Sequence, residues 1–390
     1  MVKIIKKLKA TEYGMRLAEK FFPSAKKHPA TSKHFNQAIK RFNECAAKKN
    51  TSQIKREIQV CKKYWKCYPY HYFTHDLFRA DRQLTNEELI NYIPHFYWYY
   101  LFLSHYSSQK YSIISDNKII INHFFNVLNI RKPKTLCILF DGKLFSSDMV
   151  PITFDRVKHE LTNNGYEKIF VKPAKCSGGK GIHIFHKMDD GHYETRQNII
   201  FNNAFLETIG KKTDYILQSG VIQNQEISKI YPASVNTCRI ITENKDGANR
   251  VVCAMLRMGR GHNEVDNISS GGICTHINVK SGKLGDFALS YTGERFEEHP
   301  DTHFAFRNFT IFRWDEIQKF TIEAAGKLPF FTYIGWDIAL TADGPVALEI
   351  NRDPAIDITE MTSHGLREAF DIKDPDYYWK NPGKRAWNLK

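Results

Sequence analysis

The sequence lacks the features that mark several protein classes. Its eight cysteines are scattered and form no C-x-x-C pair, which argues against a disulfide scaffold, a zinc ribbon and a thioredoxin-like site. It has no apolar run of about 18 residues, so no transmembrane helix is expected. The basic opening MVKIIKKLKA is followed by neither an apolar stretch of about 7–15 residues nor a small-residue cleavage site. We therefore expect that the thiols are reduced, that the protein is cytoplasmic and that it has no secretory signal.

The composition is that of an ordinary globular protein. Hydrophobic residues make up 42% of the chain and charged residues 25%, which excludes a disordered or collagen-like polypeptide. A length of 390 residues allows one large domain, or two to three ordinary ones, with a full-sized core.

The positive charge is concentrated in one segment. The net charge is +14; residues 1–66 contain 18 Lys and Arg against four acidic residues, and the remaining residues contain 38 of each sign. Such a patch suits nucleic acid, an anionic membrane face or a polyanionic glycan. Residues 1–22 place apolar side chains at helical spacing among lysines, which is typical of a helix that lies on a lipid surface. A solvated helix whose apolar stripe packs on its own domain is an equally open interpretation.

Residues 1–115 show mainly helical patterns. Segments 31–49 and 51–67 each open with Thr-Ser, which favours a helix N-cap, and continue with apolar residues at a spacing of three to four. Thr85 and Glu88 predict a capping box at the start of a later helix.

Proline and aromatic residues follow in the same region. Pro94 should kink or end its helix. The dense aromatic residues of segment 64–111 are interpreted mainly as core, because large aromatic side chains mostly serve burial. His71 and His75 have the spacing of zinc ligands on a helix, but no H-E-x-x-H signature surrounds them, so we interpret them as packing or surface residues.

From about residue 133 the pattern changes to strands, hairpins and glycine turns. An amphipathic stretch with Gly326 near its end predicts one helix, WDEIQKFTIEAAGKL. Runs rich in β-branched and aromatic residues predict strands, namely KTLCILF, KIFVKP, GIHIF, YILQSGVI, RIITEN, RVVCAMLRM, GICTHINV, KLGDFAL, IGWDIAL and PVALEINR.

A glycine-rich loop connects two of these strands. The first strand ends at Lys172, and the loop spans residues 177–181. Glycine lets backbone N–H groups turn toward phosphate oxygens, and lysine neutralises them. The string matches neither common phosphate-loop motif and runs from strand to strand, so alone it is weak evidence of a nucleotide site.

Two carboxylates and an amide lie in the C-terminal hairpin GWDIALTADGPVALEINRDP. Strand alternation puts Glu349 and Asn351 on one face, within reach of Asp337 across the hairpin. A surface hairpin with coincidental acids is the alternative, but both acids stand among apolar residues, and burying a carboxylate without a cation is costly. Hard oxygen donors suit Mg²⁺ that nucleotide phosphates also hold, so we predict a metal site.

Cationic and glycine residues lie between these two elements. Arg239 and Arg257 are predicted on adjacent strands, and Asn267 precedes the turn of Gly271 and Gly272. Guanidinium groups and glycine N–H groups could stabilise an anion that develops during a reaction. Structural salt bridges are the alternative for either arginine.

Together and in this order, these elements resemble the ATP-grasp superfamily. The closest resemblance is to the sugar-transfer-associated ATP-grasp proteins of bacterial polysaccharide assembly, carried by SVNTCRIIT, DNISSGGI and GWDIALTADGPVALEINRDP. It implies an α+β ATP-grasp fold, in which two α+β subdomains grip ATP, preceded by a mainly helical N-terminal domain. The expected division is a basic helical region (1–115), a first subdomain with its preceding segment and glycine-rich lid (116–215), and a second subdomain with the metal hairpin and C-terminal tail (216–390).

The resemblance also implies a role for each matching position. Lys172 would contact the α- and β-phosphates, and the first ATP lysine, which usually follows an aspartate directly, would be Lys143 in the string Asp141-Gly142-Lys143. Three residues would hold Mg²⁺: Asp337, Glu349 and Asn351. The mobile phosphate lid would be Ser177, Gly178, Gly179, Lys180 and Gly181. The hinge strand that binds adenine would contain Gln218, Ser219 and Val221. The residues facing the γ-phosphate and the activated carboxylate would be Arg239, Arg257, Asn267, Gly271 and Gly272.

ATP-grasp ligases typically convert a carboxylate to an acyl phosphate, which an amine attacks to give an amide. The resemblance therefore implies an ATP- and Mg²⁺-dependent ligase. We expect it to join an amino compound to a sugar carboxylate, or an acid to an amino sugar, in capsule or exopolysaccharide synthesis. A peptide- or protein-tail amino-acid ligase and a non-catalytic nucleotide-binding scaffold are the alternatives. Residues 1–66 would hold the protein at the inner face of the membrane or at acidic polysaccharide, and no nucleic-acid partner is expected.

Overall fold

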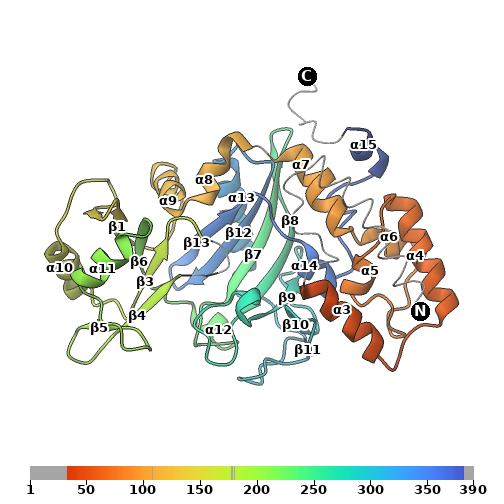
Figure 1. The fold of residues 1–390 in the computed structure, drawn as a ribbon, viewed down its shortest axis with the longest axis horizontal. Helices are drawn as coiled ribbons and strands as arrows, with labels where there is room; N and C mark the ends of the chain where they lie inside the picture. The colour runs from red at the N-terminus through yellow and green to blue at the C-terminus, as the bar shows by residue number, and fades with distance from the viewer. Residues whose placement is uncertain (1–32, 108, 177–178, 180, 382–390) are drawn as a thin grey trace.

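The structure is a computed structural model that describes residues 33–107, 109–176, 179 and 181–381. Figure 1 shows a helical region at one end, a seven-stranded sheet in the middle and a six-stranded sheet at the other end. This arrangement confirms the predicted α+β class. The helix expected in residues 1–22 lies outside the described residues. Among the helices that are described, none combines the length and apolar character needed to cross a bilayer.

Two of the three predicted helix starts fall in the part of the chain that the structure describes, since the predicted N-cap at Thr31-Ser32 lies outside it. The backbone N–H of Glu88 donates to the hydroxyl of Thr85, and the Glu88 carboxylate accepts from Thr85 in return, so the predicted capping box is present. The second predicted helix is capped by Asn50 rather than by Thr51, because the Asn50 side chain accepts from the N–H of Gln53. The elements are α3 (Lys33–Glu44), α4 (Thr51–Trp65), α5 (His71–Thr74), α6 (Asn86–Asn91), the π-helix η3 (Tyr97–Phe102) and α7 (Leu103–Tyr106).

Aromatic side chains form the core of this region, as predicted. Helix α6 ends before Pro94, and the chain resumes as the π-helix η3. In η3, the Trp98 ring lies 4.5 Å from the Phe370 ring, and the Phe102 ring lies 5.4 Å from the Tyr333 ring, measured between centroids. Trp98, Phe102 and Phe370 are almost fully buried.

The two histidines that were interpreted as packing or surface residues are both buried. Their ring centroids lie 6.0 Å apart, and His75 contacts the carboxylate of Glu360 at 3.3 Å. Burial lowers the pKa of His71 to about 3. In the described residues no group of three or more His, Cys, Asp and Glu side chains is arranged to hold a metal ion, so these histidines pack the core.

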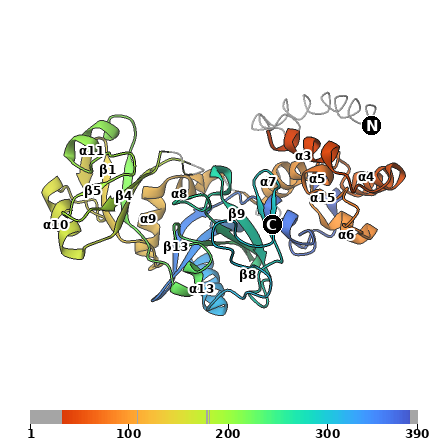
Figure 2. The same ribbon diagram turned by 90° about the horizontal axis from the view of Figure 1, so that it is seen from below.

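The six-stranded sheet is antiparallel and has the order β2-β1-β6-β3-β4-β5. Apolar side chains of β1, β3 and β6 pack with those of α10 and α11 on one face. The connecting helices α8 and α9 lie between the two sheets (Figures 1 and 2). The elements are η4 (Gln109–Tyr111), α8 (Ser112–Asp116), α9 (Lys118–Val127), β1 (Thr135–Phe140), β2 (Lys143–Phe145), α10 (Phe154–Asn164), β3 (Lys168–Pro173), β4 (His183–Lys187), β5 (Tyr193–Glu194), α11 (Asn203–Gly210) and β6 (Tyr215–Ser219).

The seven-stranded sheet has the order β11-β10-β9-β8-β7-β12-β13. Because successive side chains alternate, Ile240 and Trp336 pack with α13 on one face, whereas Ile241 and Tyr333 pack with the helical region on the other. The elements are α12 (Gln225–Ser228), β7 (Thr237–Lys245), β8 (Ala248–Met258), η5 (Ile268–Ser270), β9 (Ile273–Ile277), β10 (Ala288–Ser290), β11 (Arg295–Phe296), α13 (Trp314–Gly326), β12 (Tyr333–Thr341), β13 (Gly344–Asn351), α14 (Asp357–Thr362) and α15 (Pro375–Lys380).

The C-terminal half of the chain departs from a simple sequence of hairpins at two places. The predicted strand KLGDFAL is interrupted: Leu284 makes one bridge to Ile277, and β10 begins only at Ala288. The C-terminal helix α15 returns to the helical region, where the Trp379 indole N–H donates to the carbonyl of Trp65 at 2.9 Å. The predicted division of the chain into three regions, with boundaries at residues 115 and 215, stays a proposal. The last described residues, which were assigned to the third region, lie beside the helical region in space.

Candidate active site

A cavity of about 240 Å³ opens between the two sheets. Its walls come from β3 and β6 of the six-stranded sheet, from β7, β8, β12 and β13 of the seven-stranded sheet, from α9 and from the loop between β8 and β9. Most of the candidate residues line it: Lys172, Gly179, Gln218, Ser219, Val221, Arg239, Arg257, Asn267, Asp337, Glu349 and Asn351. Residues from elements far apart in the chain therefore share one site.

The three oxygen-donor residues lie as strand alternation predicts. Asp337 and Glu349 are register partners across the β12–β13 hairpin, and Asn351 stands opposite Gly335. All three line the cavity. The Asp343-Gly344 turn sets the register as far as Ile338 and Ala347, and a β-bulge then shifts it by one residue. The bulge, rather than the turn alone, brings Asp337 opposite Glu349.

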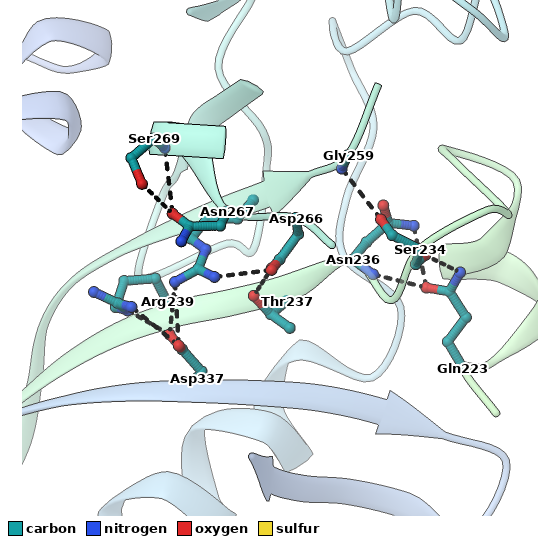
Figure 3. A network of polar contacts seen from close by, with 11 residues as sticks. Gln223, Ser234, Asn236, Thr237, Arg239, Gly259, Asp266, Asn267, Ser269 and Asp337 are labelled. Atoms are coloured by element: carbon teal, nitrogen blue, oxygen red, sulfur yellow. Dashed lines mark hydrogen bonds and ion pairs between the residues drawn. The ribbon is translucent and has the colours of Figure 1, made fainter. Parts of the chain in front are cut away.

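Asp337 is neutralised by two arginines. Its carboxylate accepts from the Arg239 Nη2 at 3.0 Å and from the Arg239 Nε (Figure 3). It also accepts from the Arg257 Nη1 at 3.1 Å. Burial would raise the pKa of Asp337, but Arg239 and Arg257 more than offset it, and the pKa lies below its usual value. The buried carboxylate was expected to need a metal ion; in this structure the two guanidinium groups supply the positive charge.

The loop after β8 adds an acid that sequence patterns did not single out as a site residue. The Arg257 Nη2 donates to Asp266 at 2.8 Å, and the Thr237 hydroxyl donates to the other carboxylate oxygen (Figure 3). Burial would lower the pKa of Arg257, but Asp266 and Asp337 raise it above its usual value. Arg257 is thus held between two carboxylates at the cavity wall.

Lys172 and Gln218 meet on the opposite wall. The Lys172 Nζ donates to the Gln218 Oε1 at 2.9 Å across the β3–β6 pair. Burial is the main cause that lowers the pKa of Lys172 to about 8. Gln218 and Ser219 are both buried on β6, where the hinge strand was predicted.

Lys118 is a cavity residue that the sequence interpretation missed. It begins α9, and the Asn117 side chain caps that helix. Its Nζ lies 3.4 Å from the Glu349 Oε1 and donates to the carbonyl of Cys176 at 2.9 Å. A signal was present, because Asp116-Asn117-Lys118 is a second Asp-x-Lys string, and its lysine is the first residue of a helix.

A family model for sugar-transfer associated ATP-grasp proteins matches residues 100–372. The chain belongs to this family. The ATP-grasp fold expected from the sequence is therefore shown, and the two sheets on either side of the cavity are its two halves. No curated protein matches the sequence significantly.

Solved structures give only distant similarities to this ATP-grasp protein. D-alanyl-alanine synthetase A from Vibrio cholerae O1 biovar eltor is 13% identical, with a TM-score of 0.39 over 69% of this chain and 66% of that one. Biotin carboxylase from Campylobacter jejuni is 11% identical, with a TM-score of 0.38 over 70% and 47%. D-alanine–D-alanine ligase from Bacillus anthracis is 13% identical, with a TM-score of 0.36 over 68% and 69%. The chain thus spans about half to two thirds of these structures, and the family assignment depends on the family model alone.

Lys143 does not take part in the ATP-grasp cavity. It lies exposed on β2, which is an edge strand of the six-stranded sheet, and it contributes nothing to the cavity wall. The predicted Lys143 contact with ATP therefore lacks structural support, whereas Lys118, Lys132 and Lys172 line the cavity. Lys143 and Lys118 are each the third residue of an Asp-x-Lys string. Lys143 follows strand β1, whereas Lys118 begins helix α9, which forms part of the cavity wall.

The predicted lid and turn glycines differ in their positions. Gly179 lines the cavity with a φ of +71°, and a Cβ atom there would lie 3.7 Å from the Asn267 Nδ2 on the opposite wall. Gly181 lies outside the cavity wall, and Ser177, Gly178 and Lys180 are outside the described residues.

Gly271 and Gly272 also lie outside the cavity wall. They shape the turn beside Asn267: the Gly272 N–H donates to the Asn267 carbonyl at 3.1 Å. A Cβ atom on Gly272 would come within 2.7–3.0 Å of three backbone oxygens. The turn needs glycine for this close approach, which is a structural reason for the sequence.

The residues of the cavity fit the magnesium ion that the ATP-grasp family implies. Glu349 is half-buried, and among the described residues Lys118 is the one side chain within ion-pair distance of its carboxylate, whereas both oxygens of Asp337 already accept from guanidinium groups. The carboxylate of Glu349 and the amide oxygen of Asn351 are the hard donors that Mg²⁺ prefers. These two residues could hold the ion beside the nucleotide phosphates, and Asp337 would join them only if its arginine contacts changed.

Proposed function

We propose that this protein is an ATP-dependent carboxylate–amine ligase that forms an amide through an acyl phosphate. The observation that carries the proposal is the cavity itself. Among the described residues, three lysines and the arginines Arg239 and Arg257 line it together with the oxygen donors Glu349 and Asn351. A triphosphate needs such a concentration of cationic groups, because a carboxylate must approach an anionic phosphate.

The residues divide the work as follows. Lys118 and Lys172 would neutralise and orient the phosphates, and Gln218 and Ser219 would face the base. When bound to Glu349 and Asn351, Mg²⁺ would withdraw charge from the phosphates. The substrate carboxylate oxygen attacks the γ-phosphorus, and ADP leaves. The amine then attacks the acyl carbon, loses a proton and expels phosphate. Arg239 and Arg257 line the space where the anionic groups meet.

The proposed substrates follow the family's description as sugar-transfer associated. We expect either a sugar carboxylate joined to an amino acid or another amine, or an acid joined to an amino sugar, in capsule or exopolysaccharide synthesis. The direct test is to screen acids and amines for ADP release and to measure the product mass. A product whose mass equals the sum of the acid and the amine minus one water supports the ligase. Products on peptide or protein termini support the alternative tail ligase, and ATP binding without ADP release under all pairs indicates a scaffold.

We also propose a peripheral location at the inner face of the membrane or at acidic polysaccharide. Helix α4 buries Ile54, Ile58 and Trp65 and exposes four cations on its outer side. Described acidic side chains form no ion pair with these four: Lys55, Arg56, Lys62 and Lys63. Anionic surfaces attract such a face.

Charge reversal tests this location better than truncation does. Removing residues 1–66 would also remove Phe42, Ile54 and Cys61 from the core of the helical region. Changing the four α4 cations to Glu should instead abolish binding to phosphatidylglycerol vesicles or to an acidic polysaccharide at low salt, while phosphatidylcholine vesicles stay unbound. Unchanged binding would show that the face is only solvated.

A further inference from the structure

Glu264 joins the loop of one sheet to Lys168, His186 and Arg196 beside the other. It lies in the segment 259–272 between β8 and β9, and its side chain is only 10% exposed. Its carboxylate accepts from the Lys168 Nζ at 2.9 Å and from the His186 Nε2 at 2.9 Å, and it lies 3.3 Å from the Arg196 Nε. Lys168 and His186 are on β3 and β4, so these contacts cross from the seven-stranded to the six-stranded sheet.

The electrostatic environment favours a charged Glu264. Burial would raise its pKa, but hydrogen bonds from Lys168 and His186 and the charge of Lys168 lower it below the usual value. An additional contact fixes the same crossing, because the Arg196 Nη1 donates to the carbonyl of His262 at 2.9 Å. An exposed ion pair contributes little to stability, whereas a buried carboxylate that accepts from several donors is strongly held.

The same segment also carries a residue that holds a candidate catalytic arginine. Asp266, two residues after Glu264, accepts from Arg257 at 2.8 Å, and Arg257 in turn donates to Asp337. Both Glu264 and Asp266 line the cavity. The start of the segment is fixed to the loop that precedes β7, since the Gly259 N–H donates to the Ser234 Oγ at 3.2 Å (Figure 3). One short stretch of chain is therefore attached to the opposite sheet at Glu264 and to the site arginines at Asp266.

We propose that Glu264 is a positioning residue that couples the approach of the two sheets to the placement of Arg257. Contact of Glu264 with Lys168, His186 and Arg196 draws the segment 264–267 to the mouth of the cavity. Asp266 then holds Arg257 against the space between the phosphates and the second substrate. The part of this inference that concerns turnover rests on the proposed ligase function, whereas the crossing contact itself does not.

The first experiment removes the charge of Glu264. Glu264→Gln leaves Lys168, His186 and Arg196 without their shared carboxylate. We expect kcat/KM for ATP-dependent ADP release to fall about tenfold or more, the effect of losing a charge-assisted hydrogen bond. Glu264→Asp keeps the charge and should recover part of the loss. The matched control is Glu226→Gln, which removes the same charge from an exposed pair with Lys229 on α12 and should behave as wild type.

The second experiment needs no reaction. In the protein without nucleotide, hydrogen exchange of the amides in 259–272 and in β4 should become faster together in Glu264→Gln, and not in Glu226→Gln. The increase in exchange in the double variant Lys168→Met/Glu264→Gln should be smaller than the two single increases combined, because either substitution alone already removes the contact.

Each outcome bears on one part of the inference. Unchanged exchange in 259–272 overturns the coupling of the sheets. Faster exchange with unchanged kcat/KM shows a purely structural contact and overturns the positioning role. If the wild-type protein releases no ADP with any substrate pair, the proposed function fails, and the exchange experiment still decides whether Glu264 couples the sheets.

Discussion

Asp337 and Glu349 are direct partners across the β12–β13 hairpin, yet different cations neutralise their carboxylates. Asp337, with a side chain 7% exposed, is held by Arg239 and Arg257, whereas Glu349, with a side chain 35% exposed, has Lys118 at 3.4 Å. The two acids are equivalent in the strand pattern but not in their surroundings. Asp337 therefore holds the arginines in place, and Glu349 is the carboxylate available to a metal ion.

Glu349→Gln should remove Mg²⁺-dependent turnover while leaving the fold intact. The glutamine has the same shape, and the half-buried position tolerates a neutral amide. Loss of metal-assisted charge stabilisation should lower ADP release at least about 100-fold, measured with a coupled ADP assay across a magnesium titration. The urea unfolding curve should stay that of the wild type. Unaltered ADP release would contradict the metal assignment.

Asp337→Asn should damage stability as well as activity. Arg239 and Arg257 would lose their shared carboxylate in a buried site, and breaking a buried ion pair from one side costs about 3–5 kcal/mol. Urea unfolding should show this loss, in contrast to Glu349→Gln. Equal stability of the two variants would mean that Asp337 does not anchor the arginines.

Lys118→Met should weaken ATP binding more than Lys143→Met does. Lys118 lines the cavity beside Glu349, whereas Lys143 is exposed on an edge strand. Loss of one charge-assisted contact to phosphate corresponds to about 10–100-fold in affinity. Calorimetric titration with Mg²⁺ and a non-hydrolysable ATP analogue measures both variants. A larger effect at Lys143 would restore the interpretation based on the Asp141-Gly142-Lys143 string.

Activity should fall at alkaline pH because of Lys172. Burial lowers its pKa to about 8, so in the ligand-free protein it is charged below this pH and neutral above it. Since kcat/KM reports groups of the free enzyme, kcat/KM for ATP should decrease as the pH rises through about 8.

A second lysine of the cavity requires a control in this experiment. Lys132 also lines the wall, and burial likewise lowers its pKa to about 8. Lys132→Met should keep the alkaline fall, whereas Lys172→Met should have low activity with no such fall between pH 7 and about 9. A fall that persists in Lys172→Met would exclude Lys172 as its source.

Local patterns were sufficient for much of this protein. Thr85 and Glu88 form the predicted capping box, and most strands lie where short β-branched runs placed them. The Asp343-Gly344 turn joins β12 to β13, and alternation along β13 puts Glu349 and Asn351 on one face. These features depend on residues within a few positions or within one hairpin, where alternation and turn geometry leave few choices.

Only the tertiary structure decided which charges meet. The sequence by itself determined an α+β chain with a three-residue oxygen-donor face, a strand-ending Lys172 and a basic first segment. It did not determine that Arg239 and Arg257 neutralise Asp337, that Lys118 rather than Lys143 reaches the cavity, or that Glu264 meets Lys168. The two members of each pair are about 80 to more than 200 residues apart in the chain. Their contact depends on how the two sheets and α9 pack. A local sequence period carries no information about that packing, because it records which face a side chain takes and not what lies opposite it.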